Sequence, residues 1–137
     1  MSHDFVIQPV GRVESALTEL SQAPKQGDEG APDASIVFDE RVREALADVH
    51  VGDELLVLTW LHRADRGVLS VHPRDDDTRP RTGVFSTRSS DRPNPIGLHR
   101  VTVLAVDGLR VQVSYLEAVD GTPVVDVKPV LDGATER

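Results

Sequence analysis

The sequence predicts a mainly β fold, a small single-domain β-barrel of about seven short strands with one short helix. The 137 residues suffice for one hydrophobic core and are too few for two, so we treat residues 1–137 as one domain. Valine is the most frequent residue, which favours strands over helices. Only one segment has the periodicity of a helix, and this disfavours a parallel sheet with crossover helices.

Short apolar segments bounded by turn residues predict the strands. We expect them at residues 5–13, 35–38, 54–61, 68–72, 82–87, 98–106, 109–115 and 124–127. Residues 54–61 are the most apolar of these segments and predict a central strand buried on both faces, although a buried helix fits the same pattern. Asp107-Gly108 joins two of the strands and is a strong hairpin signal.

The connecting segments differ in character. Asp39 is a candidate N-cap for a helix through about residue 48, and Val42, Leu46 and Val49 recur on one face of that helix. Residues 14–34 lack hydrophobic periodicity and collect Gln, Pro, Gly and acidic residues, which predicts a flexible loop. Residues 73–81 predict a charged loop, and residues 132–137 a frayed tail.

The composition disfavours several classes of function. The chain carries 15 basic and 23 acidic residues, a net charge of −8, so its surface as a whole repels nucleic acid and anionic membranes. The absence of cysteine excludes disulfides and thiolate metal sites, and the five histidines lack metal-ligand spacing. No signal peptide or membrane-spanning segment is recognisable, and we expect a cytoplasmic protein with neither a metal nor a membrane partner.

Residues 83–98 form the most unusual segment of the chain. Two prolines at positions 93 and 95 fix the backbone and hold Arg92 and Asn94 in extended conformations. The segment displays Arg88, Arg92 and Asn94, and Gly97 allows backbone or a ligand to approach closely. A rigid structural loop between strands would use the same residues, so this alternative stays open. The sequence contains no nucleophile elbow, Walker loop or Rossmann fingerprint, so covalent and phosphoryl-transfer mechanisms lack support.

Polar residues gather in four segments that adjoin strands, and we expect these segments to converge at one rim of the barrel. They are Pro24-Lys25-Gln26, His62-Arg63, Arg88 to Asn94, and Asp120-Gly121-Thr122 with Asp126 and Lys128. Taken singly, His62-Arg63 reads as a strand end and Asp120-Gly121-Thr122 as a turn. The combination predicts a ligand site.

Two motifs carry a resemblance to a known family. They are Gly83-Val-Phe-Ser-Thr-Arg-Ser-Ser-Asp-Arg-Pro-Asn-Pro-Ile-Gly-Leu98 and Val119-Asp-Gly-Thr-Pro-Val-Val-Asp-Val-Lys-Pro129. With Val10-Gly-Arg-Val-Glu-Ser15 and Leu61-His62-Arg63, the chain closely resembles the TrmO/TsaA-like family of S-adenosylmethionine-dependent methyltransferases. The resemblance implies a homodimeric β-barrel enzyme that binds the methyl donor near the dimer interface and methylates threonylcarbamoyladenosine beside the tRNA anticodon.

The resemblance also implies which residues contact the methyl donor. Carried over position by position, they are Pro24, Lys25, Gln26, His62, Arg63, Arg88, Leu98, Glu117, Ala118, Val119 and Asp120. Arg92, Asn94, Asp126 and Lys128 match other motif positions and are expected to shape the site. An arginine suits the donor's carboxylate, and an acidic residue suits its sulfonium. Methyl transfer depends more on positioning than on a strong acid or base, and the sequence identifies no catalytic base.

The chain departs from the family pattern at two positions. Lys25 stands where the family usually has arginine, and Val130 stands where a tyrosine normally follows the Lys-Pro pair. The sequence also ends without the additional C-terminal domain that some members carry. Because phosphate binding needs local basic surface, the acidic charge keeps two alternatives open. These are a methyltransferase for a small nucleoside or metabolite, and a non-catalytic module that binds S-adenosylmethionine.

Overall fold

The computed structural model of the protein describes residues 4–16 and 33–131. The strands in this part of the chain are β1 (Gly11–Glu14), β2 (Ala34–Phe38), β3 (Glu54–Trp60), β4 (Ser70–Val71), β5 (Thr82–Gly83), β6 (Ile96–Asp107), β7 (Arg110–Val113) and β8 (Pro123–Pro129). Six of them close into a barrel in the order β1-β2-β7-β6-β3-β8, with antiparallel pairing throughout. The predicted small β-barrel is confirmed.

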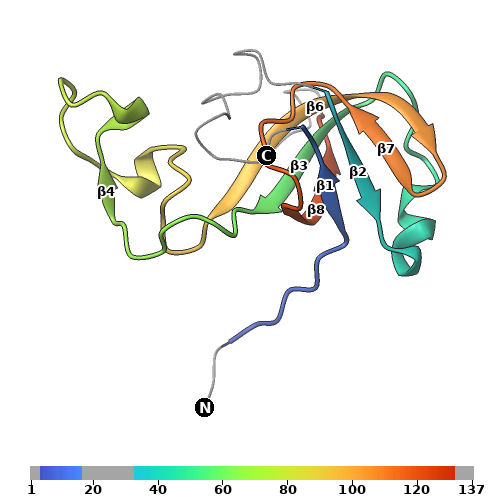
Figure 1. Ribbon diagram of the computed structural model, residues 1–137, viewed down its shortest axis with the longest axis horizontal. Helices are drawn as coiled ribbons and strands as arrows, with labels where there is room; N and C mark the ends of the chain where they lie inside the picture. The colour runs from blue at the N-terminus through green and yellow to red at the C-terminus, as the bar shows by residue number, and fades with distance from the viewer. Residues whose placement is uncertain (1–3, 17–32, 132–137) are drawn as a thin grey trace.

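β4 and β5 pair only with each other among the described strands. They belong to the segment between β3 and β6, residues 61–95, which we call the arm. Figure 1 shows the arm standing to one side of the barrel, joined to it through the ends of β3 and β6. Three short 3₁₀ helices complete the described structure: η3 (Glu40–Leu46), η4 (Pro73–Asp75) and η5 (Val84–Ser86). No helix in residues 4–16 and 33–131 is long and apolar enough to cross a membrane.

β-Branched side chains fill the interior of the barrel. The most deeply buried are Val13, Ile36, Val57, Val101, Val103, Val111, Val113 and Val124. Successive side chains of a strand point to opposite faces, so β3 buries Leu55, Val57 and Thr59 while Leu56 and Leu58 stay partly exposed. The expectation that this strand is buried on both faces is wrong, because only its inner face meets the barrel core.

The register of β3 sets the geometry of the site. β3 lies between β6 and β8, and its outward Leu58 pairs with Leu98 on one side and Asp126 on the other. One residue further along, the inward Thr59 pairs with Gly97 of β6. A change of register by one residue would exchange these inner and outer sets.

Several predicted elements differ in extent from the structure. The strand expected at residues 5–13 is limited to its last three residues, since residues 5–10 lie outside any strand and Phe5 is 90% exposed. Of the loop expected at residues 14–34, Glu14 belongs to β1 and Ala34 to β2, and residues 17–32 lie outside the described residues. The predicted strands 68–72 and 82–87 shrink to β4 and β5, and Val84 begins η5.

The helix expected at residues 39–48 is present as the 3₁₀ helix η3. Asp39 occupies the N-cap position, but its side chain makes no capping hydrogen bond. The backbone bonds in this region are i→i+3 bonds, for example from Val42 N to Asp39 O. Val42, Leu46 and Val49 pack on the core, as the spacing predicts.

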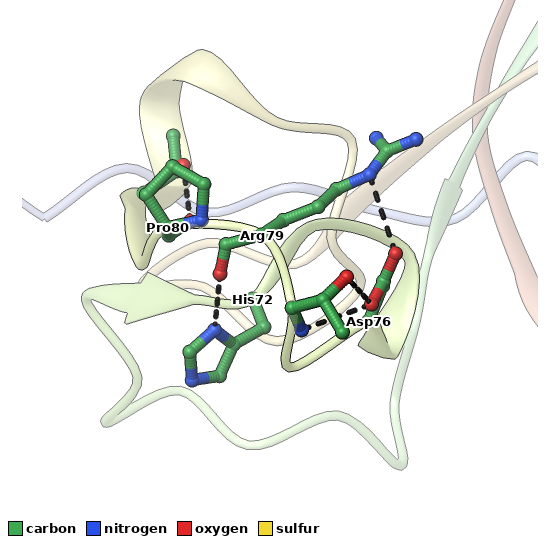
Figure 2. Close-up of polar contacts among 6 residues, drawn as sticks. His72, Asp76, Arg79 and Pro80 are labelled. Atoms are coloured by element: carbon green, nitrogen blue, oxygen red, sulfur yellow. Dashed lines mark hydrogen bonds and ion pairs between the residues drawn. The ribbon is translucent and has the colours of Figure 1, made fainter.

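The charged loop at residues 73–81 is held by contacts within the arm. His72 Nδ1 donates to the Arg79 carbonyl at 2.9 Å, and Arg79 forms an ion pair with Asp76 at 3.6 Å (Figure 2). The Thr78 hydroxyl and backbone N–H both donate to Asp76 Oδ1, and these bonds lower the pKa of the Asp76 carboxyl below its ordinary value of 3.8.

Candidate functional site

Arg92 braces the loop that displays Arg88. Its half-buried guanidinium donates to the backbone carbonyls of Val84, Thr87 at 3.1 Å and Ser89 at 3.0 Å. Hydrogen bonds from a charged donor are stronger than neutral ones, so three carbonyls on one guanidinium fix the course of the loop. Arg88 lies between two of these carbonyl residues, and its own side chain is exposed.

A second arginine joins the turn after β3 to the segment before β6. Arg66 Nε donates to the Pro93 carbonyl at 2.7 Å, and Arg66 Nη2 donates to Asn94 Oδ1 at 2.9 Å. The same guanidinium lies 5.1 Å from the ring centroid of Trp60, within the range of a cation–π interaction. These contacts position the base of the arm against the end of β3.

Backbone groups strengthen the same junction. Asp65 N donates to Asp91 Oδ1 at 2.8 Å, Arg92 N donates to the Asp65 carbonyl at 3.1 Å, and Leu61 N donates to the Pro95 carbonyl at 2.8 Å. His62 and Arg63 are exposed on the turn that these bonds hold. The structure therefore brings this turn together with the Arg-Pro-Asn-Pro segment, two parts of the chain that lie about 30 residues apart.

On the outer surface of the barrel, Leu98 and Asp126 flank Leu58 across three adjacent strands. Leu98 is 41% exposed, and Asp126 is partly buried. Lys128 Nζ lies 3.2 Å from Asp126 Oδ2. This row offers an apolar patch with one acidic and one basic group beside it.

Inside the barrel, His99 forms a continuous hydrogen-bonded chain with Thr59 and Glu117. Thr59 Oγ1 is 2.7 Å from His99 Nε2, and His99 Nδ1 is 2.6 Å from Glu117 Oε1. Thr59 is 0% exposed and His99 is 4% exposed. The expected close approach at Gly97 is present, but the approaching atoms are these two side chains. A Cβ at Gly97 would overlap Thr59 Oγ1 and lie 2.7 Å from His99 Nε2.

Asp120 lies where the segment before β8 meets β1, and the start of β8 pairs with the end of β3 through Val124 and Thr59. Its Oδ1 accepts a hydrogen bond from Ser15 N at 3.1 Å. Gly121 N donates to the Val13 carbonyl, and Val13 N donates to the Thr122 carbonyl. Asp120 and Gly121 line a surface depression of about 590 Å³ together with residues of β1, β2 and β7.

The structure thus forms two groups from the predicted site residues. His62 and Arg63 share the base of the arm with Arg92 and Asn94, and Arg88 is displayed further along the arm. Glu117 to Asp120 lie between the His99 chain and β1. Among the described residues, no hydrogen bond or ion pair links Arg88 to the segment 117–120. Pro24, Lys25 and Gln26 lie outside the described residues, as does the tail at 132–137.

A family model for the tRNA-methyltransferase O N-terminal domain matches residues 12–134. This match covers most of the chain. The chain belongs to the TrmO family. The family match includes every position that the resemblance assigns to the site, from Pro24 to Lys128.

Curated relatives agree with this assignment to the TrmO family. A "Probable S-adenosyl-L-methionine-binding protein" of Methanothermobacter thermautotrophicus is 42% identical over 123 residues, which cover 90% of this chain and 88% of the relative. An "S-adenosyl-L-methionine-binding protein" of Archaeoglobus fulgidus is 37% identical over 124 residues, covering 90% of this chain and 88% of the relative. A second protein of A. fulgidus, also a "Probable S-adenosyl-L-methionine-binding protein", is 42% identical, but the chain spans only 33% of its length.

Solved TrmO structures share the fold. A crystal structure of TrmO superposes with a TM-score of 0.75 at 29% identity, covering 100% of this chain and 63% of the TrmO chain. TrmO from Pseudomonas aeruginosa gives a TM-score of 0.74 at 28% identity, with 100% of this chain and 60% of the TrmO chain covered. The chain therefore corresponds to about three-fifths of the TrmO polypeptides that it resembles.

Sequence reasoning missed the partners of the site residues. The sequence offers Arg66 only as part of a short basic stretch with Arg63 and does not predict its bonds to Pro93 and Asn94. Thr59 was treated only as part of an apolar strand, and His99 only as one of five scattered histidines. A signal for His99 was present, because Gly97, His99, Val101 and Val103 alternate with period two and are all buried.

Proposed function

We propose that this TrmO-family protein binds S-adenosyl-L-methionine and transfers its methyl group to N6 of threonylcarbamoyladenosine in tRNA. The observation that carries the proposal is the family match over residues 12–134, a range that contains all of the positions expected to bind the donor. Relatives that cover nearly the same length are named for S-adenosylmethionine binding, and they support the choice of donor.

The residues present are chemically suited to this donor. Bound S-adenosylmethionine supplies an electrophilic methyl group on a positively charged sulfur. Arg88 offers an exposed guanidinium that can pair with a carboxylate in a bidentate manner. Glu117 and Asp120 offer carboxylates for the ammonium and for the positive sulfur. A contact with the sulfonium must stay moderate, because the charge is lost in the transition state and a strong contact would stabilise the ground state instead.

The two groups of site residues are complementary across a pair of molecules. In one chain the arm carries Arg88 away from the barrel, whereas the acidic segment 117–120 lies on the barrel. The arm also exposes apolar side chains, with Phe85 86% exposed and Leu69 70% exposed. We propose a homodimer in which the arm packs on a second copy of the chain and the donor binds near the contact. Burial of these side chains provides the driving force.

tRNA is the proposed acceptor despite the net charge of −8. Exposed arginines concentrate on the arm, where Arg63, Arg66, Arg74, Arg79 and Arg81 are all at the surface. Local basic surface of this kind determines phosphate binding more directly than the overall charge does. We expect the RNA backbone to contact the arm.

A second candidate is a non-catalytic module that binds S-adenosylmethionine. It is favoured by the names of the two archaeal relatives that cover nearly the same length, which state binding and no reaction. The two functions share the donor site and differ in turnover.

Calorimetry with S-adenosylmethionine tests the shared part of the proposal. We expect saturable binding, and a chain that binds no donor would contradict both candidates. Arg88→Ala should weaken binding by about 2 kcal/mol, roughly 30-fold, if Arg88 makes a charged hydrogen bond to the donor. Arg43→Ala is the matched control, because Arg43 is exposed on η3 and pairs only with Glu40 among the contacts described.

Mass spectrometry of the RNA then separates enzyme from binding module. Incubation with donor and threonylcarbamoylated tRNA should add one methyl group to the modified nucleoside, whereas unmodified tRNA should stay unchanged. Transfer to the free nucleoside but not to tRNA would favour a small-molecule acceptor. Binding of the donor without transfer to either would establish the second candidate.

A further inference from the structure

A buried histidine lies next to the candidate donor site and has no role in the reaction proposed above. His99 of β6 uses both ring nitrogens, one toward Thr59 of β3 and the other toward Glu117. Its position is fixed from both sides, because Gly97 leaves room for the Thr59 hydroxyl and the ring nitrogen. An imidazole held at two points cannot turn without breaking a hydrogen bond in the barrel interior.

The donor and acceptor roles along this chain follow from the chemistry of its ends. An ionised Glu117 carboxylate can only accept, so His99 Nδ1 must carry a hydrogen and donate it. In a neutral imidazole Nε2 is then the acceptor, and the Thr59 hydroxyl donates to it. The Glu117 carboxylate thereby selects the ring tautomer, and the Thr59 hydroxyl, which can donate or accept, satisfies the other ring nitrogen. The two hydrogen bonds therefore point the same way, from Thr59 to His99 and from His99 to the Glu117 carboxylate.

Only one end of the chain can meet a ligand. Thr59 is 0% exposed, whereas the Glu117 side chain is 17% exposed. His99 engages Glu117 Oε1, and among the described residues no hydrogen bond or ion pair engages Oε2. Glu117 is also the first residue of the segment 117–120, whose last member is tied to β1 through Ser15. A carboxylate fixed by one oxygen presents the other in a defined direction.

We propose that Thr59 and His99 form a positioning unit that orients the Glu117 carboxylate toward a positively charged or hydrogen-bond-donating group of the methyl donor. This inference rests on the proposed function, since it takes the donor as the ligand of the segment 117–120. Neither Thr59 nor His99 contacts the ligand. Their contribution is preorganisation, because a carboxylate already held in its binding rotamer loses less entropy when the ligand arrives.

Thr59→Val tests the proposal at a residue that no ligand can reach. The change is nearly isosteric, removes the hydroxyl that holds His99 Nε2 and leaves Glu117 in place. We expect the dissociation constant for S-adenosylmethionine, measured by calorimetry, to rise about fivefold, as loss of one orienting hydrogen bond would give. Thr59→Ser keeps the hydroxyl and should restore binding to within about twofold of the original protein.

Two further variants distinguish positioning from a general loss of stability. Val111→Ala opens a cavity in the same barrel core, on β7 and away from His99, and should lower stability without changing donor affinity. Glu117→Gln weakens binding directly, and adding Thr59→Val to it should cause little further loss, because the positioned charge is already gone. An equal fold-change from Val111→Ala, or full additivity with Glu117→Gln, would overturn the positioning role.

A readout on the free protein keeps this proposal separable from the proposed function. Nitrogen-15 NMR of the His99 ring should show a hydrogen on Nδ1, and Thr59→Val should alter the Nε2 signal. A ring protonated at Nε2 in the free protein would overturn the inference whatever the ligand does. If the original protein binds donor and Thr59→Val leaves its affinity unchanged, the positioning role fails while the proposed function stands. If the original protein binds no donor, both fail.

Discussion

Replacing Gly97 with alanine should destabilise the barrel strongly, because the new methyl group would overlap buried side chains. A Cβ at this position would overlap Thr59 Oγ1, and it would lie 2.7 Å from His99 Nε2 and 3.2 Å from Leu61 Cδ2. Thr59 and Gly97 are directly paired across β3 and β6, and both neighbouring side chains are buried. The Thr59 hydroxyl must therefore leave His99 or the two strands must separate.

The magnitude of this destabilisation follows from three contributions. Loss of a buried hydrogen bond costs about 1–3 kcal/mol, and insertion of a methyl group into a packed interior costs about 1–3 kcal/mol. Alanine also restricts the backbone of the unfolded chain more than glycine does, and this offsets about 0.4–1 kcal/mol of the destabilisation. The expected loss in the free energy of unfolding is then about 3 kcal/mol, a large fraction of the total stability of a domain of this size.

Urea denaturation followed by Trp60 fluorescence measures this loss. With a slope of about 2 kcal/mol per molar urea, the midpoint should fall by about 1.5 M. Gly83→Ala is the matched control, because Gly83 has φ −58° and no atom lies within 4 Å of its added Cβ. Removing the obstructing hydroxyl in Gly97→Ala/Thr59→Ala should recover part of the loss. A Gly97→Ala protein within about 0.5 kcal/mol of the original would refute the packing argument.

Three further predictions concern the arm. Arg92→Lys should speed amide hydrogen exchange of residues 84–90 without a matching change in the barrel, because an ammonium cannot reach three carbonyls as the guanidinium does; equal exchange in both proteins would contradict the bracing role. The Asp76 carboxyl should titrate below 3.8 in carbon-13 NMR, and Thr78→Ala should raise its pKa. Since the folded-state pKa of Asp76 is lowered, its stabilising contribution is present above 3.8 and is lost as the pH falls through the folded value; an unchanged pKa in Thr78→Ala would exclude this cause. Phe85→Ser should shift the oligomer toward monomer in light scattering, whereas the equally exposed Phe5→Ser should not, and a parent protein that is already monomeric would contradict the proposed dimer.

Local patterns in the sequence predicted most of the barrel strands. The alternation from Gly97 to Val103 indicates which side chains face inward, and Asp107-Gly108 predicts the turn between β6 and β7, where Gly108 has φ 59°. The distinction between an α-helix and the 3₁₀ helix η3 was not predictable, because both place Val42 and Leu46 against the core. The early end of β5 was not predictable either, because it depends on hydrogen bonds from the distant Arg92 guanidinium to the carbonyls of Val84, Thr87 and Ser89.

The site was less predictable than the fold, because its contacts depend on register. Thr59 and His99 are 40 residues apart, and His99 and Glu117 are 18 residues apart. These three residues come together through the pairing of β3 with β6 and the course of the chain after β7. Neither feature can be recognised from a short stretch of sequence. The same holds for Arg66 and Asn94, which are 28 residues apart and meet where the arm returns to the barrel. The family resemblance indicated the functional positions without indicating what supports them.

The peptide around Asp120 belongs to the proposed donor site and also joins the first and last strands of the barrel. β1 and β8 share two paired positions, and the bonds from Gly121 and Thr122 to Val13 extend that seam. A ligand that binds this peptide should therefore stabilise the pairing of β1 with β8 and, with it, the closed barrel. Ligand binding should therefore slow amide hydrogen exchange in β1, which is hydrogen-bonded to this peptide, and mutations that weaken the pairing of β1 with β8 should also weaken ligand binding.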